Sequence, residues 1–534
     1  MILFQQSRNS IQYYFVLAGA LFSLCSIIFA PHRAFGQTSA QLYVKEYRVE
    51  GAKHLPRPEV EKAVYPYLGP GRTAQDVEQA RAALEKAYRA NGFQTVTVQV
   101  PPQDGRNGVI VLQVEEMTVG RLRVKGARYF LPSEIKKQAP SLHEGEVIDF
   151  NAVTQDILAL NRQADLRVTP TLRPGIEPNT VDIDLEVKDT SPLHGSLELN
   201  NRYSDNTDPL RVNGAIRYDN LWQLGHSAGM SFQVSPEDLS EVKVFSGFYT
   251  ARFSQLPSLS LMLQGTKQDS NVSTLGGAAV AGKGEFFGPH LALTLPNGKD
   301  FYHSVNVGID YKHYDNNVVI AGVETVTPIS YYPLCAAYAA TWAKTGAVTE
   351  LNAGVNTHFR GMGSGVSQFD SSRYEARGDY IYFKGDLSHT HDLPWGFQAF
   401  AKVQGQFADQ PLLNSEQFSM GGLSTVRGYL ESAALGDNAL ALSLEMRTPS
   451  VGSLGWMHVD EWRFYTFADG GVLTLRQTLA EQDSSYKLAS WGLGSRIRFR
   501  EHFNGSFDMG VPLIGQGDIN AHDLLFTFRL YADF

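Results

Sequence analysis

Apolar and polar residues alternate along most of the chain from residue 189 to its end. The alternation is clearest at 211–218, 305–312 and 440–447, and it recurs at 228–234, 258–264, 495–500 and 504–511. A period of two residues predicts β-strands with one apolar and one polar face. A soluble β-sandwich alternates in the same way, so the pattern alone leaves a sandwich and a membrane barrel open.

Residues 42–188 have a different pattern, in which a unit of about 75 residues occurs twice. The segment 48–53 (RVEGAK) returns at 123–128 as RVKGAR. Each copy continues with a short helical segment, a longer helical segment and two strands. The sequence therefore predicts two tandem β-α-α-β-β domains, at 42–117 and 118–188.

Local signals place the longer helix of each copy. In the first, Thr73 and Asp76 form a predicted capping box and Gly92 ends the helix. In the second, Asn151 is the predicted N-cap. The closing strands are expected at 95–100 and 108–114 in the first copy, and at 166–172 and 180–187 in the second.

The N-terminus predicts export. Arg8 precedes an apolar stretch at 13–30, and Ala34-Phe35-Gly36 offers small residues at the positions that a signal peptidase inspects. Residues 1–36 are therefore interpreted as a cleaved signal peptide. An uncleaved anchor helix is the alternative, although no stop-transfer feature follows. Cys335 is the one cysteine after the signal, so no internal disulfide is expected.

Composition narrows the choice of fold and function. With 46 basic against 55 acidic residues the net charge is −9, and nothing suggests binding to nucleic acid. A mean hydropathy of −0.21 excludes a multi-helix membrane protein but not a barrel. The signal peptide, the aromatic residues at segment ends and the last strand favour an outer-membrane barrel at 189–534. At about 10 residues per tilted strand, roughly 16 strands fit.

Polar positions of these strands are expected to face a wet lumen. They carry Asp310, Lys312, Glu445, Arg447, Arg463, Arg496, Arg498 and Arg500. We interpret most of them as a solvated wall rather than a binding site.

Two other segments resemble chemical sites and are set aside. The segment 277–283 begins like a phosphate-binding loop, but Gly284 stands where Ser or Thr would bind magnesium, so a hairpin loop is expected. His389, His391 and Asp392 precede Leu393-Pro394 and are interpreted as a polar turn rather than a metal site. The sequence predicts no catalytic residue, no metal and no cofactor.

Two longer motifs carry a family resemblance. One is 416–429 (EQFSMGGLSTVRGY), followed by Gly436-Asp437; the other is 467–471 (FADGG). With the paired modules and Pro101-Pro102-Gln103, the chain resembles the outer-membrane transporters of two-partner secretion, the haemolysin secretion/activation family of the POTRA-plus-barrel superfamily. The resemblance covers essentially the whole mature chain. The VRGY element is shared across the superfamily, whereas the two modules, with 158–161 and 174–175 in the second, indicate the secretion branch.

The resemblance implies two periplasmic POTRA domains, a 16-stranded barrel and an extracellular loop folded into the lumen. The tip of that loop would present Val426, Arg427, Gly428 and Tyr429. Its arginine would pair with Asp469, in the strand motif that also contains Phe467 and Gly471. Strand parity agrees, because Arg463, Phe467 and Asp469 are all expected to face inward. A surface turn with an unpaired arginine is the alternative.

The resemblance also implies the function. The POTRA domains would capture an unfolded partner that has an N-terminal secretion domain, and the barrel would pass it outward without nucleotide hydrolysis. Other expected partners are outer-membrane lipid and the barrel assembly machinery, which would recognise the terminal Phe534. A barrel-assembly factor and a porin are the alternatives. The cargo stays open between an adhesin, a cytolysin, a heme-acquisition protein and a contact-dependent toxin.

One family feature is not expected. Only residues 37–41 separate the predicted cleavage site from the first module. They are too few for a plug helix that traverses a barrel about 30 Å deep.

Overall fold

The structure is a computed structural model that describes residues 41–534 except 206, 240, 254–255, 274–279, 321–322, 453–458 and 481. The predicted signal peptide and nearly all of the segment that follows it lie outside the described residues. The chain divides into two compact units, one with residues up to Asn91 and Val96–Glu116, the other with Gly92–Thr95 and Met117–Phe534. Among the described residues, no helix combines the length and the apolar character needed to cross a membrane.

The first unit contains the first POTRA module. Its elements are β1 (Leu42–Val44), β2 (Glu46–Glu50), α1 (Arg57–Val64), β3 (Gly69–Arg72), α2 (Ala74–Ala90), β4 (Thr97–Gln99) and β5 (Val109–Glu115), with 3-10 turns at Tyr65–Tyr67 and Gly105–Asn107. β2, β5 and β4 form one sheet in that order, and β1 pairs with β3. α2 begins with the capping box of Thr73 and Asp76 that the sequence predicts.

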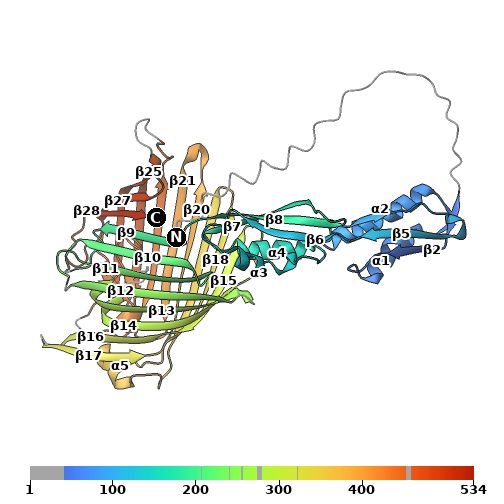
Figure 1. Cartoon of the computed structure of the whole chain (residues 1–534). Helices are drawn as coiled ribbons and strands as arrows, with labels where there is room; N and C mark the ends of the chain where they lie inside the picture. Colours follow the sequence, from blue (N-terminus) through green and yellow to red (C-terminus); the bar gives the residue numbers. More distant parts are fainter. Residues whose placement is uncertain are drawn as a thin grey trace. The chain divides into compact units, whose positions relative to one another are not determined.

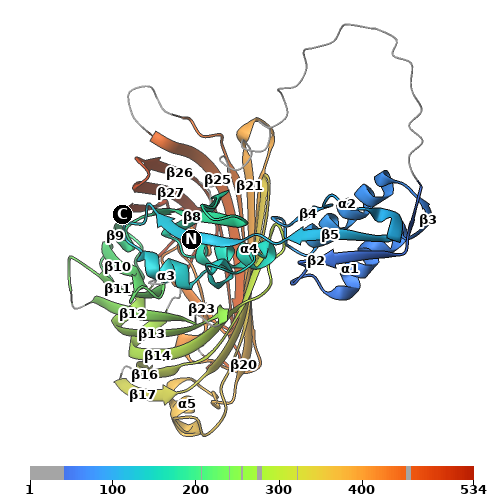
Figure 2. The ribbon, with the colours of Figure 1, turned by 45° about the vertical axis from the view of Figure 1, so that its right-hand side comes forward.

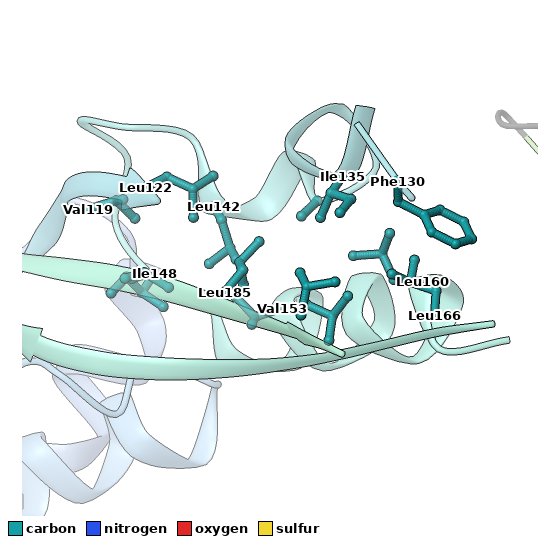
Figure 3. Packing of buried hydrophobic residues seen from close by; sticks show 14 of the residues in the cluster. Val119, Leu122, Phe130, Ile135, Leu142, Ile148, Val153, Leu160, Leu166 and Leu185 are labelled. Atoms are coloured by element: carbon teal, nitrogen blue, oxygen red, sulfur yellow. The ribbon is translucent and has the colours of Figure 1, made fainter. Parts of the chain in front are cut away.

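The second unit begins with the second module. It contains β6 (Thr118–Lys125), α3 (Pro132–Lys137), a 3-10 turn at Pro140–Leu142, α4 (Phe150–Leu160), β7 (Leu166–Pro174) and β8 (Thr180–Asp189), with sheet order β6-β8-β7. Ile135 of α3 and Val153 of α4 pack toward Leu185 of β8 (Figure 3). The predicted N-cap is wrong: Asp149, not Asn151, accepts the amides of residues 151 and 152. Both residue types cap well, and α4 starts two residues earlier than the pattern indicated.

The repeated glycine serves the same purpose in both modules. Gly51 and Gly126 have φ values of +84° and +85°, which glycine adopts without strain. A Cβ at Gly51 would lie 2.3 Å from the carbonyl oxygen of Val114, and one at Gly126 would lie 2.5 Å from that of Val187. The turn after β2 therefore passes directly against β5, and the turn after β6 passes directly against β8.

A carboxylate closes this turn in each module. Glu116 accepts the amides of Lys53 and His54 at 2.9 and 3.1 Å, and Asp189 accepts those of Arg128 and Tyr129. Burial by itself raises the pKa of both carboxyls, but the hydrogen bonds outweigh it, so each pKa lies below its ordinary value.

The remaining strands close a barrel (Figures 1 and 2). They are β9 (Leu193–Asn200), β10 (Arg211–Leu221), β11 (His226–Val234), β12 (Val242–Phe253), β13 (Leu256–Ser273), β14 (Val280–Thr294), β15 (Phe301–Ile309), β16 (Tyr311–Ile320), β17 (Val323–Tyr331), β18 (Leu334–Lys344), β19 (Ala347–Thr357), β20 (Ile381–Asp392), β21 (Gln398–Ala408), β24 (Asn438–Arg447), β25 (Val459–Thr474), β26 (Ser485–Phe499), β27 (Phe503–Pro512) and β28 (Leu525–Asp533). A short helix, α5 (Val366–Ser372), follows β19, and a 3-10 turn, Pro394–Gly396, precedes β21.

These strands cross the barrel wall 16 times, and we call each crossing a pass. Two of the passes are each interrupted and so consist of two strands. β15 and β16 are halves of one pass, separated at Asp310, and β17 and β18 are halves of the next, separated at Tyr332 and Pro333. β14 accordingly pairs with both β15 and β16. The predicted fold class, two POTRA modules followed by a 16-stranded barrel, is confirmed.

The two faces of the strands follow the predicted alternation. Leu440, Leu442 and Leu444 of β24 are exposed on the outer face, and Ala441 is buried on the inner one. Two local predictions are wrong. Arg500 lies in the turn after β26 rather than on the lumen wall, and His389 and His391 belong to β20 rather than to a turn. The segment 277–283 is only partly described, and from Val280 it belongs to β14.

Candidate functional site

The segment between β21 and β24 folds onto the inner face of the barrel wall. We call residues 409–437 the lumen loop. It contains a 3-10 turn at Asn414–Glu416 and a small hairpin of β22 (Phe418–Met420) and β23 (Ala434–Gly436). Its buried apolar side chains pack with inward residues of β24, β25 and β26; the cluster consists of Met420, Val426, Tyr429, Ala434, Ala441, Leu473 and Leu488.

Arg427 of the lumen loop lies against Asp469 of β25. Its Nε donates to Oδ2 at 2.7 Å and its Nη2 donates to Oδ1 at 2.8 Å, so the contact is bidentate. The Arg427 amide also donates to Asp469, at 3.1 Å. The Asp469 side chain is fully buried, and that of Arg427 is 6% exposed. A buried carboxylate that accepts from both the backbone and the guanidinium fixes the loop tip in position and orientation.

Further charges surround this pair. Arg427 Nη1 donates to Glu445 at 2.5 Å, and Asp508 lies 3.8 Å away. Glu445 in turn accepts from Arg447 and Arg496, at 2.8 and 3.1 Å. Three guanidinium groups thus meet three carboxylates. Such balance matters because a charge that is buried without a partner is strongly destabilising.

Aromatic rings and glycines of neighbouring strands complete the cluster. The Phe467 ring lies under the Arg427 guanidinium, 3.8 Å from its carbon to the ring centroid, which is a cation–π contact. A Cβ at Gly492 would lie 2.4 Å from the Phe467 ring. Glycine at this position of β26 is what leaves space for the ring. Phe467 therefore supports the arginine from the wall side.

The other three residues of the VRGY motif also pack against the barrel wall. Val426 is fully buried, and the Tyr429 hydroxyl donates to the carbonyls of Ala489 and Ile514, at 2.9 and 2.7 Å. Gly428 has a φ of +85° and packs against Gly510, where a Cβ would lie 2.6 Å from the Gly428 backbone. Two glycines facing each other allow the loop and β27 to touch backbone to backbone.

The two remaining predicted site residues lie in different places. Gly471, inward on β25, faces Met420 of the lumen loop, and a Cβ there would lie 2.6 Å from the Met420 sulfur. Phe534 lies away from the loop, where β28 meets β9. Its amide and carbonyl pair with those of Gly195, both at 3.0 Å.

Glu416 is a loop residue whose importance the sequence analysis missed. Its carboxylate is buried and accepts from Lys312 and Tyr331, both at 2.6 Å, and from Tyr382 at 2.7 Å. These partners belong to β16, β17 and β20, a different part of the wall from the one that holds Arg427. Lys312, interpreted as part of a solvated wall, is instead the cationic partner of a buried loop carboxylate.

Two more carboxylates hold the end of the lumen loop. Glu431 accepts from Arg202, between β9 and β10, at 2.7 Å. Asp437 accepts the amides of Leu412 and Arg476, at 2.9 and 2.7 Å, so it joins both ends of the loop. Glu416 begins the motif 416–429, and Asp437 follows it. Their place in or beside the motif was the only sign in the sequence that these two carboxylates matter. Their partners are distant in sequence and could not be named from it.

Comparison with known proteins identifies the family and the fold. The family described as "Haemolysin secretion/activation protein ShlB/FhaC/HecB" matches residues 179–497, and "POTRA domain, ShlB-type" matches residues 42–116. The outer membrane transporter CdiB of Escherichia coli O6:K15:H31 is 23% identical, over 91% of this chain and 81% of its own. The heme/hemopexin transporter protein HuxB of Haemophilus influenzae (strain ATCC 51907 / DSM 11121 / KW20 / Rd) is 20% identical, over 71% and 67%.

Solved structures show the same fold. CdiB from Escherichia coli superposes with a TM-score of 0.64 at 20% identity, covering 95% of this chain and 93% of the other. BamA from Haemophilus ducreyi lacking POTRA domains 1–3 superposes with a TM-score of 0.56 at 13% identity, covering 93% of this chain and 100% of the other. The protein resides in the bacterial outer membrane with its POTRA domains in the periplasm. The family match spans most of the chain, and the chain belongs to the haemolysin secretion/activation family of two-partner secretion transporters.

Proposed function

We propose that the protein captures an unfolded, exported partner polypeptide with its POTRA domains and passes it through the barrel to the cell surface or medium, without nucleotide hydrolysis. The partner carries an N-terminal secretion domain. The observation that carries the proposal is the lumen loop, held inside the barrel by buried but reversible polar contacts. A loop held by hydrogen bonds can leave its place for a passing chain and then return.

Capture by strand addition needs a sheet edge with unpaired backbone groups. One edge of the second module is closed. The side chain of Asn161 accepts the Val168 amide at 2.7 Å and donates to its carbonyl at 3.0 Å, and Pro170 has no amide to offer. β7 is therefore blocked at two alternate positions that face away from β8.

The first module offers a better edge. The Glu46 amide donates to Gly108, toward β5, so the backbone groups of Tyr47 and Val49 point the other way. None of the hydrogen bonds found among the described residues covers that side of β2. On the opposite edge, the carbonyl of Val98 in β4 already accepts from Arg81 at 3.2 Å. We therefore assign capture to the outer edge of β2.

Proline substitution tests this assignment. Val49→Pro removes an outward amide of β2 and leaves the groups that pair with β5, so we expect secretion of the partner to fall at least tenfold. Leu172→Pro on the blocked β7 edge is the matched control and should secrete normally. Hydrogen exchange should also slow at Tyr47 and Val49 when the partner's N-terminal domain binds. Normal secretion by Val49→Pro together with unchanged exchange would refute capture at β2.

A deletion separates transport from barrel assembly. Without residues 42–188 the barrel should still insert, and secretion of the partner should stop while other outer-membrane proteins assemble normally. Normal secretion by the truncated barrel would disprove the proposed use of the modules. A general loss of outer-membrane proteins would support an assembly factor instead.

A further inference from the structure

A histidine, an aspartate and a cysteine meet on the inner face of the barrel, beside the contact between Lys312 and Glu416 of the lumen loop. His290 belongs to β14, Asp310 separates β15 from β16, and Cys335 belongs to β18. Each offers one potential ligand atom, and these three atoms lie within 4.8 Å of one another. His290 Nδ1 is 3.7 Å from the Cys335 sulfur, and its Nε2 is 2.8 Å from Asp310 Oδ1.

The distances are close to those that a tetrahedral zinc ion requires. With bond lengths of about 2.0–2.3 Å to nitrogen, oxygen and sulfur, neighbouring ligand atoms are about 3.3–3.5 Å apart. The sulfur and Nδ1 are already near that separation. In the structure Asp310 contacts Nε2, on the other side of the ring, so its carboxylate must turn toward Nδ1 for all three groups to bind one ion. Asp310 itself lies outside a regular strand, since β15 ends at Ile309 and β16 begins at Tyr311.

Glycines make room for the cluster. A Cβ at Gly288 would lie 1.9 Å from Asp310 Oδ1 and 3.0 Å from His290 Nε2. A Cβ at Gly308, directly opposite His290 in the neighbouring strand, would lie 2.6 Å from the imidazole. The side chains of Asn306 and Gln264 contact the two ring nitrogens at 2.9 and 3.3 Å and orient the ring. An ion on Nδ1 would take the place of the Asn306 contact, and Gln264 on Nε2 would remain as the outer contact that is typical of histidines that bind metals.

The donor set selects a class of metal. Thiolate and imidazole favour zinc and similar borderline-soft ions over magnesium or calcium, which bind oxygen. Lys312, two residues from Asp310, forms its ion pair with Glu416 and not with the Asp310 carboxylate. His290 is 8% exposed and Cys335 is partly exposed. We propose that His290, Asp310 and Cys335 bind one zinc-class divalent cation, with water as fourth ligand, and that the ion joins β14 and β18 to the interruption between β15 and β16.

Cobalt is a suitable probe because its bond to a thiolate gives a charge-transfer absorption band. The full-length chain in detergent micelles should develop this band with one cobalt per chain, and zinc should remove it. Cys335→Ser should abolish the band, and His290→Gln and Asp310→Asn should each weaken binding at least tenfold. His303→Gln in β15 is a matched control and should bind normally. The second potential group, Asp165, His194 and Asp219, has no thiol and cannot give the band.

Two measurements avoid variants that alter the ligands. Gly308→Ala, where a Cβ would lie 2.6 Å from His290 Nδ1, should weaken binding at least tenfold, whereas Gly247→Ala, where a Cβ meets nothing nearer than 3.7 Å, should not. In the unaltered protein, one equivalent of zinc should slow maleimide labelling of Cys335 at least tenfold, and magnesium should not. A cobalt band that survives Cys335→Ser, or labelling that zinc leaves unchanged, would overturn the site.

Discussion

Buried charges decide how tightly the lumen loop is held. The three side-chain nitrogens of Arg427 donate to three different oxygens, two of Asp469 and one of Glu445. A lysine ammonium cannot reproduce that planar arrangement. Removing one partner leaves a buried charge uncompensated, at a cost of about 3–5 kcal/mol. The stability of the loop position therefore depends on the pairing of these groups more than on their number.

We expect Arg427→Ala and Asp469→Ala each to reduce secretion at least tenfold while the barrel still inserts. Arg427→Lys should rescue poorly, because one ammonium cannot satisfy two carboxylates at once. The measurement is a double-mutant cycle on secretion that includes the exchange Arg427→Asp with Asp469→Arg. Arg463→Ala, a lumen arginine away from the lumen loop, is the control. Strictly additive effects with no recovery in the exchange would contradict the pairing.

The carboxylate at the turn of the first module predicts a pH dependence. Because the pKa of Glu116 is lowered on folding from an ordinary value of 4.5, its contribution is present above about pH 4.5 and is lost as the pH falls through the folded pKa. Glu116→Gln should destabilise a fragment of residues 37–190 by about 1–3 kcal/mol at neutral pH. The difference from wild type should shrink in acid.

Urea unfolding followed by circular dichroism at neutral pH and at about pH 3 measures this difference. Glu61→Gln on the exposed face of α1 should change stability by less than about 0.5 kcal/mol. A difference between Glu116→Gln and wild type that is the same at both pH values would exclude the proposed linkage.

At the scale of elements, features that depend on residues near each other in the sequence could be predicted, and contacts between distant residues could not. The capping box of Thr73 and Asp76 depends on residues three apart, and the inward parity of Asp469 depends on its own strand, so both could be predicted. The contact of Glu416 with Tyr331 joins residues 85 apart. No local pattern says which wall a loop will face, so this half of the site could not be predicted. The interrupted passes were missed too, because alternation continues across Asp310.

The start of the lumen loop should contribute to closing the channel independently of the Arg427 contact. Glu416→Gln removes the charge that neutralises Lys312, so the start of the loop should loosen and single-channel conductance in planar bilayers should rise. Adding Lys312→Met should partly restore the low conductance, because it removes the buried cation that was left unpaired. If Lys312→Met added nothing to Glu416→Gln, the two residues would not act as a pair.

At the scale of the whole molecule, the barrel closes where its last strand meets its first. Five residue pairs join β28 to β9, from Arg529 opposite Asn200 to Asp533 opposite Ser196. Phe534 extends this seam, and its ring occupies the space above Gly195, where a Cβ would lie 2.2 Å from the ring. The terminal residue thus takes part in closing the barrel, and recognition by the assembly machinery is the second use that we expect of it.

Refolding distinguishes these two uses of Phe534. We expect Phe534→Ala to lower the amount of folded barrel in cells, and also to slow refolding of the purified chain into detergent micelles, where no assembly machinery is present. Heat-modifiable electrophoretic mobility measures the folded fraction. Leu524→Ala, exposed just before β28, is the control. A defect confined to cells would restrict Phe534 to recognition.

The separate attachments of the lumen loop have a consequence for the time that opening takes. Glu416, Arg427 and Glu431 hold it at three separate parts of the barrel, and the three contacts share no side chain. Each donor or acceptor can be taken over by water or by the arriving chain before the next is released. The delay before passage is then set by the slowest single exchange, not by the sum of all contacts. A channel that leaks little at rest can therefore still open quickly when its cargo arrives.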